Sequence, residues 1–356
     1  MFLSWTTILP VVAAIVLALA WGRTLPAVFV AVIGILLAGA VLAAVHHAEV
    51  VAHRVGEPFG SLVLAVAVTV IEVALIVTLM IAGAASAETL ARDTVFAAVI
   101  MTSNGIVGLS ILVGTLRTAV VSFNAEGARP ALATVATLST LGLILPTFTT
   151  SRPGPVFSPA QLAFAAVTAL AVYGLFVALQ TGRHRDYFLP GEAGAVADEH
   201  AAPPSTGAAL ISLALLLVAL VAVVGNAKLV SPTIEQIVKA AGLPVSVVGV
   251  VIAMLILLPE TLAAVRAARR GSLQISLNLA YGSAMASIGL TIPTLAVVSI
   301  WLPVPLHLGL DATHIVLFML TSIVSVLTVV PGRATLLQAG VHLALLAAYL
   351  FLAVSP

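Results

Sequence analysis

The stretch from Phe59 to Ala82 reads FGSLVLAVAVTVIEVALIVTLMIA, and its one charged residue is Glu72. A helix of roughly 20 apolar residues, rising about 1.5 Å per residue, spans the hydrocarbon core of a bilayer. The stretch therefore predicts a transmembrane helix with a carboxylate near its middle. Because an ionised carboxylate at that depth costs a few kcal/mol, we expect Glu72 to have a function.

Composition extends this interpretation to the whole chain. Of its 356 residues, 62% are hydrophobic and 8% are charged, which is far from the balance of a soluble domain. We expect an all-α polytopic membrane protein with about 11 transmembrane helices. The expected spans are 6–22, 25–45, 59–82, 94–115, 130–149, 160–181, 207–225, 244–265, 273–300, 312–330 and 334–354. The lack of cysteine excludes disulfides and thiolate metal sites, and the net charge of +1 argues against a nucleic-acid partner.

A long polar stretch divides the chain into two halves. Residues 182–206 contain Asp186, Glu192 and the pair Pro203 and Pro204, a composition typical of a linker. We expect an extra N-terminal helix in residues 1–24, a five-helix repeat in 25–181, a polar cytoplasmic linker in 182–206 and a second five-helix repeat in 207–356. An odd number of spans inverts the second repeat relative to the first, as in many secondary transporters.

Two acidic residues occupy corresponding positions in these halves. Among 13 Asp and Glu residues, only Glu72 and Glu260 are expected inside spans, each in the second span of its half. A lone glutamate could be protonated and tie helices together, but a matched pair favours a functional site. Pro259 has no N–H, so the carbonyl of Leu255 lacks its usual helical partner. This carbonyl could bind a cation, or Pro259 could simply mark an ordinary proline kink.

Neutral oxygens are expected close to the two carboxylates. Thr69 shares the helix face of Glu72, and Ser103, Asn104 and Ser283 lie within the spans that follow the two glutamate spans. Each side chain is a candidate cation ligand. Hydroxyl groups in membrane helices also bond the backbone carbonyl one turn back, so this alternative stays open.

Three histidines, His46, His47 and His53, precede the Glu72 span. Histidine titrates near neutral pH, so this segment is a candidate cytoplasmic pH sensor. The alternative is an interfacial helix whose polar face lies in water.

Cationic residues predict the orientation, because loops rich in Lys and Arg stay cytoplasmic. On the side of the N-terminus an eleven-span chain has nine: Arg54, Arg117, Arg129, Arg183, Arg185, Arg266, Arg269, Arg270 and Arg333. The other side has five: Arg23, Arg92, Arg152, Lys228 and Lys239. We therefore expect an integral membrane protein with a cytoplasmic N-terminus.

Two motifs resemble a known family. The first is Gly56-Glu57-Pro58-Phe59-Gly60 followed by Glu72 and then Ser103-Asn104, and the second is Leu258-Pro259-Glu260-Thr261 with the basic turn from Arg266 to Gly271 and Gly282-Ser283. They resemble the paired repeats of the calcium/cation antiporter superfamily, and most closely its ChaA-like bacterial calcium/proton antiporters. The wider family commonly has a Gly-Asn pair before each glutamate, where this chain has Val68-Thr69 and Ile256-Leu257.

The resemblance and the paired carboxylates together predict a secondary active transporter, and the resemblance to bacterial antiporters implies that it lies in a bacterial plasma membrane. We expect it to exchange calcium for protons by alternating access around a midplane site, with Glu72 and Glu260 as the cation and proton ligands. The transported ions and the lipid bilayer are its expected partners, and no cofactor is expected. Sodium or potassium exchange for protons is the main alternative. An intramembrane enzyme or a channel is more remote, since the chain lacks the H-E-x-x-H and G-x-S-x-G motifs.

Overall fold

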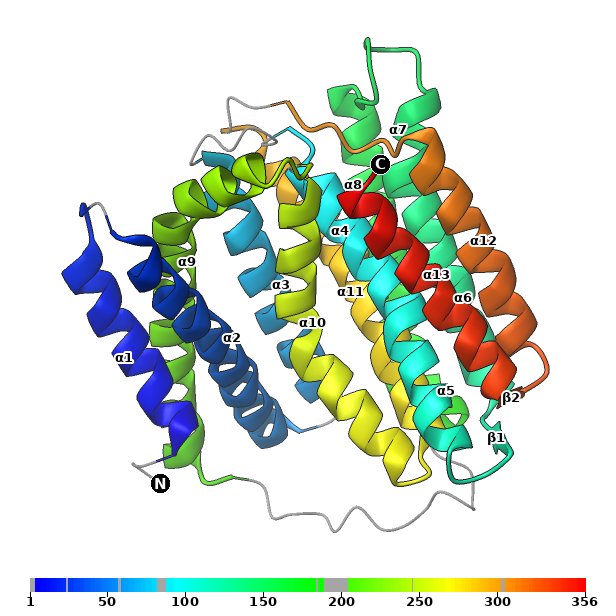
Figure 1. Cartoon of the computed structure of the whole chain (residues 1–356). Helices are drawn as coiled ribbons and strands as arrows, with labels where there is room; N and C mark the ends of the chain where they lie inside the picture. Colours follow the sequence, from blue (N-terminus) through cyan, green and yellow to red (C-terminus); the bar gives the residue numbers. More distant parts are fainter. Residues whose placement is uncertain are drawn as a thin grey trace. The chain divides into compact units, whose positions relative to one another are not determined.

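The computed structural model describes residues 4–23, 25–56, 59–81, 88–183, 185–188, 204–244, 246–301 and 305–356. Its helices are α1 (Trp5–Ala20), α2 (Ala27–Val55), α3 (Phe59–Ile81), α4 (Leu90–Ile100), α5 (Val107–Thr115), α6 (Ala125–Ser139), α7 (Leu145–Phe148), α8 (Pro159–Ala178), α9 (Thr206–Ala240), α10 (Ser246–Arg269), α11 (Leu273–Val298), α12 (Ala312–Val329) and α13 (Leu336–Val354) (Figure 1). Helical turns of other types are η1 (Met101–Ile106), η2 (Thr140–Ile144), η3 (Leu179–Arg183) and η4 (Arg185–Phe188), and the strands are β1 (Val120–Ser122) and β2 (Arg333–Thr335).

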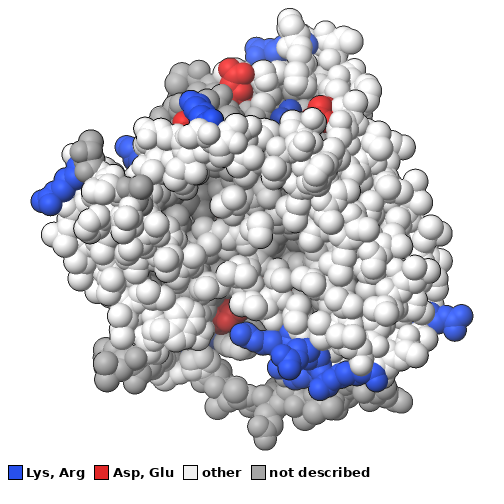
Figure 2. Space-filling model, in the orientation of Figure 1, with Lys and Arg blue, Asp and Glu red and all other residues white. Residues whose placement is uncertain are grey.

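The helices match the composition of a membrane protein. Within the described ranges, ten are long and apolar enough to cross a bilayer, and α1 is a shorter apolar helix of 16 residues. Figure 2 shows a face that is almost wholly uncharged, with Lys and Arg side chains gathered near its edges. The expected all-α membrane fold with an additional N-terminal helix is confirmed.

Two helices are longer than the sequence predicted. The polar segment from His46 to Arg54 continues α2, and α9 runs to Ala240 although its span was expected to end at residue 225. Glu235, which was expected outside the spans, therefore lies within a helix. Glu57, Pro58 and the linker residues 189–203 lie outside the described residues.

Polar side chains fix where several helices begin. Ser158 and Gln161 form a capping box at the start of α8, with Pro159 at the first helical position. Asn124 and Asp311 accept hydrogen bonds from the first-turn N–H groups of α6 and α12. These bonds satisfy backbone donors that have no partner inside the helix.

The chain divides into two compact units, and the first contains Met1–Leu90 and His200–Ile256. In it α2 packs along α9, α1 packs against both, and α3 contacts α2 and α9 (Figure 1). Gly39 and Gly225 allow the close approach of α1, because a Cβ at either position would meet Leu9 or Leu17.

The second unit contains Ala91–Glu199 and Leu257–Pro356. Here α11 packs against α6 and α8, and α13 packs against α5 and η1. At one end β1 pairs with β2 in antiparallel register, with Val121 opposite Ala334. At the same end Arg129 donates to the Val330 carbonyl at 2.7 Å and Arg117 donates to the Arg269 carbonyl.

At the other end of this unit, a different set of loops makes contact. The Gly309 N–H donates to the Pro155 carbonyl at 3.0 Å, the Leu310 N–H donates to the Leu143 carbonyl at 2.8 Å, and Arg92 donates to the Gly309 carbonyl at 3.2 Å. Each end thus joins loops that an eleven-span chain places on one side of the membrane.

Candidate functional site

Glu72 lies near the middle of α3 in the first unit. Its side chain is 2% exposed, and Thr69, one turn earlier, is also buried. The continuous run of Val, Ile and Leu around them makes α3 a membrane helix by length and composition. The structure therefore places a buried carboxylate inside a span, as the sequence predicted.

Glu260 lies on α10 in the second unit, directly after Pro259. The helix remains continuous through the proline, and Glu260 is half-buried. Proline cannot donate to the carbonyl four residues earlier, which belongs to Leu255. The Thr261 hydroxyl bonds the Leu257 carbonyl at 2.7 Å, so this hydroxyl follows the local pattern common in membrane helices.

Ser103 and Asn104 occupy an irregular turn. They lie in η1, a π-helical turn between α4 and α5, and both are buried. π-turns inside helices often occur at functional sites, because the extra residue redirects side chains. The sequence predicted an unbroken span here and gave no sign of the turn.

Ser283 lies half-buried on α11, in the same unit as Ser103, Asn104 and Glu260. The neighbouring Ser276 hydroxyl donates to the Ala264 carbonyl at 2.7 Å and so ties α11 to α10. The candidate ligands thus divide between units: Glu72 and Thr69 belong to the first, and the other four belong to the second.

Sequence reasoning missed a buried polar cluster in the second unit. Asn104 donates to Thr321 at 2.9 Å and also bonds His342 at 3.1 Å. Thr321, Ser325 and Thr328 are all buried and lie on one face of α12, with the spacing i, i+4, i+7. That spacing is visible in the sequence and could have identified the polar face.

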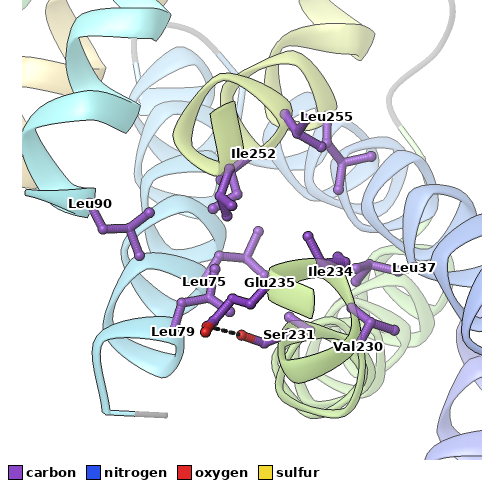
Figure 3. Close-up of a pocket in the computed structure, with 13 residues that line it drawn as sticks. Leu37, Leu75, Leu79, Leu90, Val230, Ser231, Ile234, Glu235, Ile252 and Leu255 are labelled. Atoms are coloured by element: carbon purple, nitrogen blue, oxygen red, sulfur yellow. Dashed lines mark hydrogen bonds between the residues drawn. The ribbon is translucent and has the colours of Figure 1, made fainter. Parts of the chain in front are cut away.

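A second missed feature is a cavity in the first unit. It has a volume of about 80 Å³ and lies among α2, α3, α9 and α10, with mostly leucine, isoleucine and valine walls (Figure 3). Its polar members are Ser231 and Glu235, whose side chains are 3.4 Å apart. Leu75 and Leu79 also line it, and they follow Glu72 by one and two turns, so the cavity adjoins the face of α3 that contains Glu72.

Within the described ranges, no group of three or more His, Cys, Asp or Glu side chains could hold a metal ion. Carboxylate, hydroxyl and amide oxygens inside membrane spans are nevertheless the kinds of ligand that hard cations bind.

A helical membrane fold with one glutamate inside a span of each half is typical of proteins that move ions across membranes. The sequence profile of the sodium/calcium exchanger protein family matches residues 25–182 and 211–355, so the chain belongs to that family. The two matched segments confirm an architecture of two repeats after an extra helix. Membership also makes the chain a transporter and removes the enzyme alternative.

Two curated relatives align with this chain over nearly the whole length of both proteins. The chain is 43% identical to the y4hA protein of Sinorhizobium fredii (strain NBRC 101917 / NGR234), an alignment covering 99% of this chain and 96% of the relative. It is 34% identical to the sodium-potassium/proton antiporter ChaA of Escherichia coli (strain K12), over 96% of this chain and 94% of the relative. The predicted resemblance to ChaA-like proteins is confirmed.

Solved structures share the fold. The structure of native YfkE superposes with a TM-score of 0.72 at 16% identity, covering 99% of this chain and 100% of that one. The H⁺/Ca²⁺ exchanger CAX gives a TM-score of 0.63 at 16% identity, with 98% and 93% covered. At this identity the likeness shows the fold alone.

Proposed function

We propose that this chain is a proton-coupled cation antiporter that uses Glu72 and Glu260 as its proton and cation ligands. One observation supports this most strongly: each of the two family repeats places one glutamate inside a membrane span. Intramembrane carboxylates usually mark ion pathways or proton relays. Thr69, Ser103, Asn104 and Ser283 are proposed as neutral ligands.

Charge balance explains how such a pair couples the two ions. Two protons neutralise two carboxylates, and so does one divalent cation. A carrier with both carboxylates ionised and empty would be costly to rearrange inside a low-dielectric membrane. Exchange is then favoured over leak, because protons and cations compete for the same oxygens.

Calcium is the proposed cargo. It binds carboxylate, carbonyl and hydroxyl oxygens in flexible geometries, and the proposed ligands supply carboxylate, amide and hydroxyl oxygens. The Leu255 carbonyl, to which Pro259 has no N–H to donate, would add a further oxygen.

Sodium or potassium exchange for protons is the second candidate. It is favoured by the ChaA relative, whose name specifies sodium, potassium and protons. One monovalent cation together with one retained proton also neutralises two carboxylates. The cargo must therefore be decided by transport assays.

The decisive experiment measures cation uptake by proteoliposomes under an imposed pH gradient. Calcium, sodium and potassium are supplied separately to the wild-type protein, Glu72→Gln and Glu260→Gln. We expect calcium uptake by wild type and its loss in both variants, because glutamine keeps the shape of the side chain but neither ionises nor exchanges a proton.

Glu126→Gln is the matched control, because Glu126 is exposed in the first turn of α6 and should leave uptake unchanged. Normal uptake by folded Glu72→Gln or Glu260→Gln would refute the assigned role. Uptake of sodium or potassium without calcium would select the second candidate.

A further inference from the structure

His342 is a buried, titratable residue that the proposed ion site does not use. It lies on α13 and is fully buried, and its ring bonds two other helical segments of the second unit. Nδ1 lies 3.1 Å from Oδ1 of Asn104 in η1, and Nε2 lies 3.1 Å from the Thr328 hydroxyl of α12. Asn104 in turn donates from Nδ2 to Thr321 at 2.9 Å.

These contacts form one continuous chain of hydrogen bonds. With Asn104 in this orientation, its Oδ1 accepts from the His342 Nδ1–H and its Nδ2 donates to Thr321. Nε2 of the neutral imidazole then accepts from the Thr328 hydroxyl. The two side chains that bond the ring, Asn104 and Thr328, are uncharged, so the geometry fits the neutral Nδ1–H tautomer.

The chain holds both sides of the Asn104 amide. Asn104 is 0% exposed, and rotation of its amide would break the bonds to His342 and Thr321 together. Asn104 also belongs to a π-helical turn, whose backbone hydrogen bonds are less regular than those of an α-helix. The side-chain bonds of Asn104 therefore help to fix the conformation of this turn, which its backbone hydrogen bonds constrain less than those of an α-helix would.

Tight packing alone does not explain the choice of histidine. The His342 Cβ lies against Gly108, where an added Cβ would approach to 3.1 Å. In the same unit Tyr173 of α8 lies against Gly289 of α11, where an added Cβ would approach to 2.8 Å. At both places the base of an aromatic side chain lies over a glycine and lets two helices approach closely, but only the His342 ring, of these two, bonds a candidate cation ligand.

We propose that His342 is a positioning residue of the cation site, which holds the Asn104 amide and the adjoining Ser103 in a fixed orientation. This inference rests on the proposed function, in which Ser103 and Asn104 are neutral ligands. His342 itself does not bind the transported ion. Its removal should therefore weaken cation affinity and leave the slower steps of transport little changed.

The test compares three substitutions in proteoliposomes. His342→Leu keeps an apolar side chain over Gly108 but cannot bond Asn104, and we expect the KM for the transported cation to rise about fivefold while kcat changes less than about twofold. His342→Asn can still donate to Asn104 and should restore KM to within about twofold of wild type. Thr328→Val removes the distal bond and should lower thermal stability without changing KM.

A double-mutant cycle tests whether His342 acts through Asn104. The dissociation constants for calcium, sodium and potassium are measured by calorimetry on purified wild type, His342→Leu, Asn104→Ala and the double variant. We expect the double variant to match Asn104→Ala, because the second substitution has nothing left to disturb. Multiplicative losses, or an unchanged affinity in His342→Leu, would overturn the proposal.

Glu260→Gln in the same series separates the two proposals. Normal transport by Glu260→Gln would reject the function assigned to the glutamates. An inactive Glu260→Gln beside His342→Leu with wild-type affinity would reject only the positioning role.

Discussion

Asp311 caps α12 and bonds the same neighbour twice. Its Oδ1 accepts from the His314 N–H at 2.9 Å, and its Oδ2 lies 2.6 Å from His314 Nδ1. The side-chain bond with His314, assisted by the His314 backbone N–H and the Arg92 charge, lowers the pKa of Asp311 to about 2. The carboxylate is therefore ionised across the physiological pH range.

We expect Asp311→Ala to lower the free energy of unfolding by about 1 kcal/mol, and Asp311→Asn to lower it by less, because asparagine still caps the helix. Since the folded pKa lies below the ordinary value of 3.8, the stabilisation from ionisation is complete above that value and is lost as the pH falls through about 2. Thermal unfolding in detergent at neutral pH measures the difference. An alanine variant as stable as wild type would contradict the capping role.

At the residue scale, the intramembrane carboxylates were predictable from the sequence, but the hydrogen-bond network around Asn104 was not. Glu72 and Glu260 were predictable because a carboxylate inside an apolar span is conspicuous and costly. The bonds from Asn104 to Thr321 and His342 were not predictable, because they join residues separated by more than 200 positions. Only the spacing of Thr321, Ser325 and Thr328 gave a local sign of this buried polar face.

At the element scale, hydrogen bonds from side chains of α2 and α9 to backbone carbonyls of α1 hold these three helices of the first unit together. Pro10 lacks the N–H that would bond the Thr6 carbonyl, and His47 Nε2 of α2 instead lies 3.0 Å from that carbonyl. Asn226 of α9 donates to the Ala13 carbonyl at 3.0 Å. We therefore expect His47 to stabilise the packing of α1 against α2. His46 and His53 are exposed and stay candidates for pH sensing.

We expect His47→Leu to destabilise the protein by about 1–3 kcal/mol, because it leaves the Thr6 carbonyl buried without a donor. Pro10→Ala restores the helical N–H, so adding it to His47→Leu should recover part of the loss. Thermal unfolding of both single variants and the double variant measures this coupling. His46→Leu is the matched control, since His46 is exposed, and equal losses with and without Pro10→Ala would contradict the explanation.

Helix existence was predictable from hydropathy, but helix ends were not. α9 continues through Ser231, Pro232 and Glu235 as far as Ala240, although these polar residues and the proline favoured an earlier end. Packing of this segment beside the cavity of the first unit stabilises a helix that local composition disfavours. The same effect extends α2 through His47, which is buried against α1.

At the scale of the whole molecule, the loop contacts of the second unit constrain topology. The strand pair β1–β2 joins the loop after α5 to the loop after α12, and the bond from Gly309 to Pro155 joins the loop before α8 to the loop before α12. Each pair must lie on one side of the membrane. Alternating spans predicted this sorting, because each helix returns the chain to the opposite side.

The orientation itself is tested most directly by cysteine labelling, for which this chain is suited because it contains no cysteine. Thr118→Cys and Ser151→Cys place single thiols in exposed loops at opposite ends of the second unit. The excess of Arg on the side of Thr118 predicts that Ser151→Cys reacts with a membrane-impermeant maleimide in intact cells, and that Thr118→Cys reacts only after the membrane is opened. The reverse pattern would place the N-terminus outside the cytoplasm. In that case the proton gradient of the cell would act on the two repeats from the opposite side. The roles assigned to Glu72 and Glu260 would stay the same.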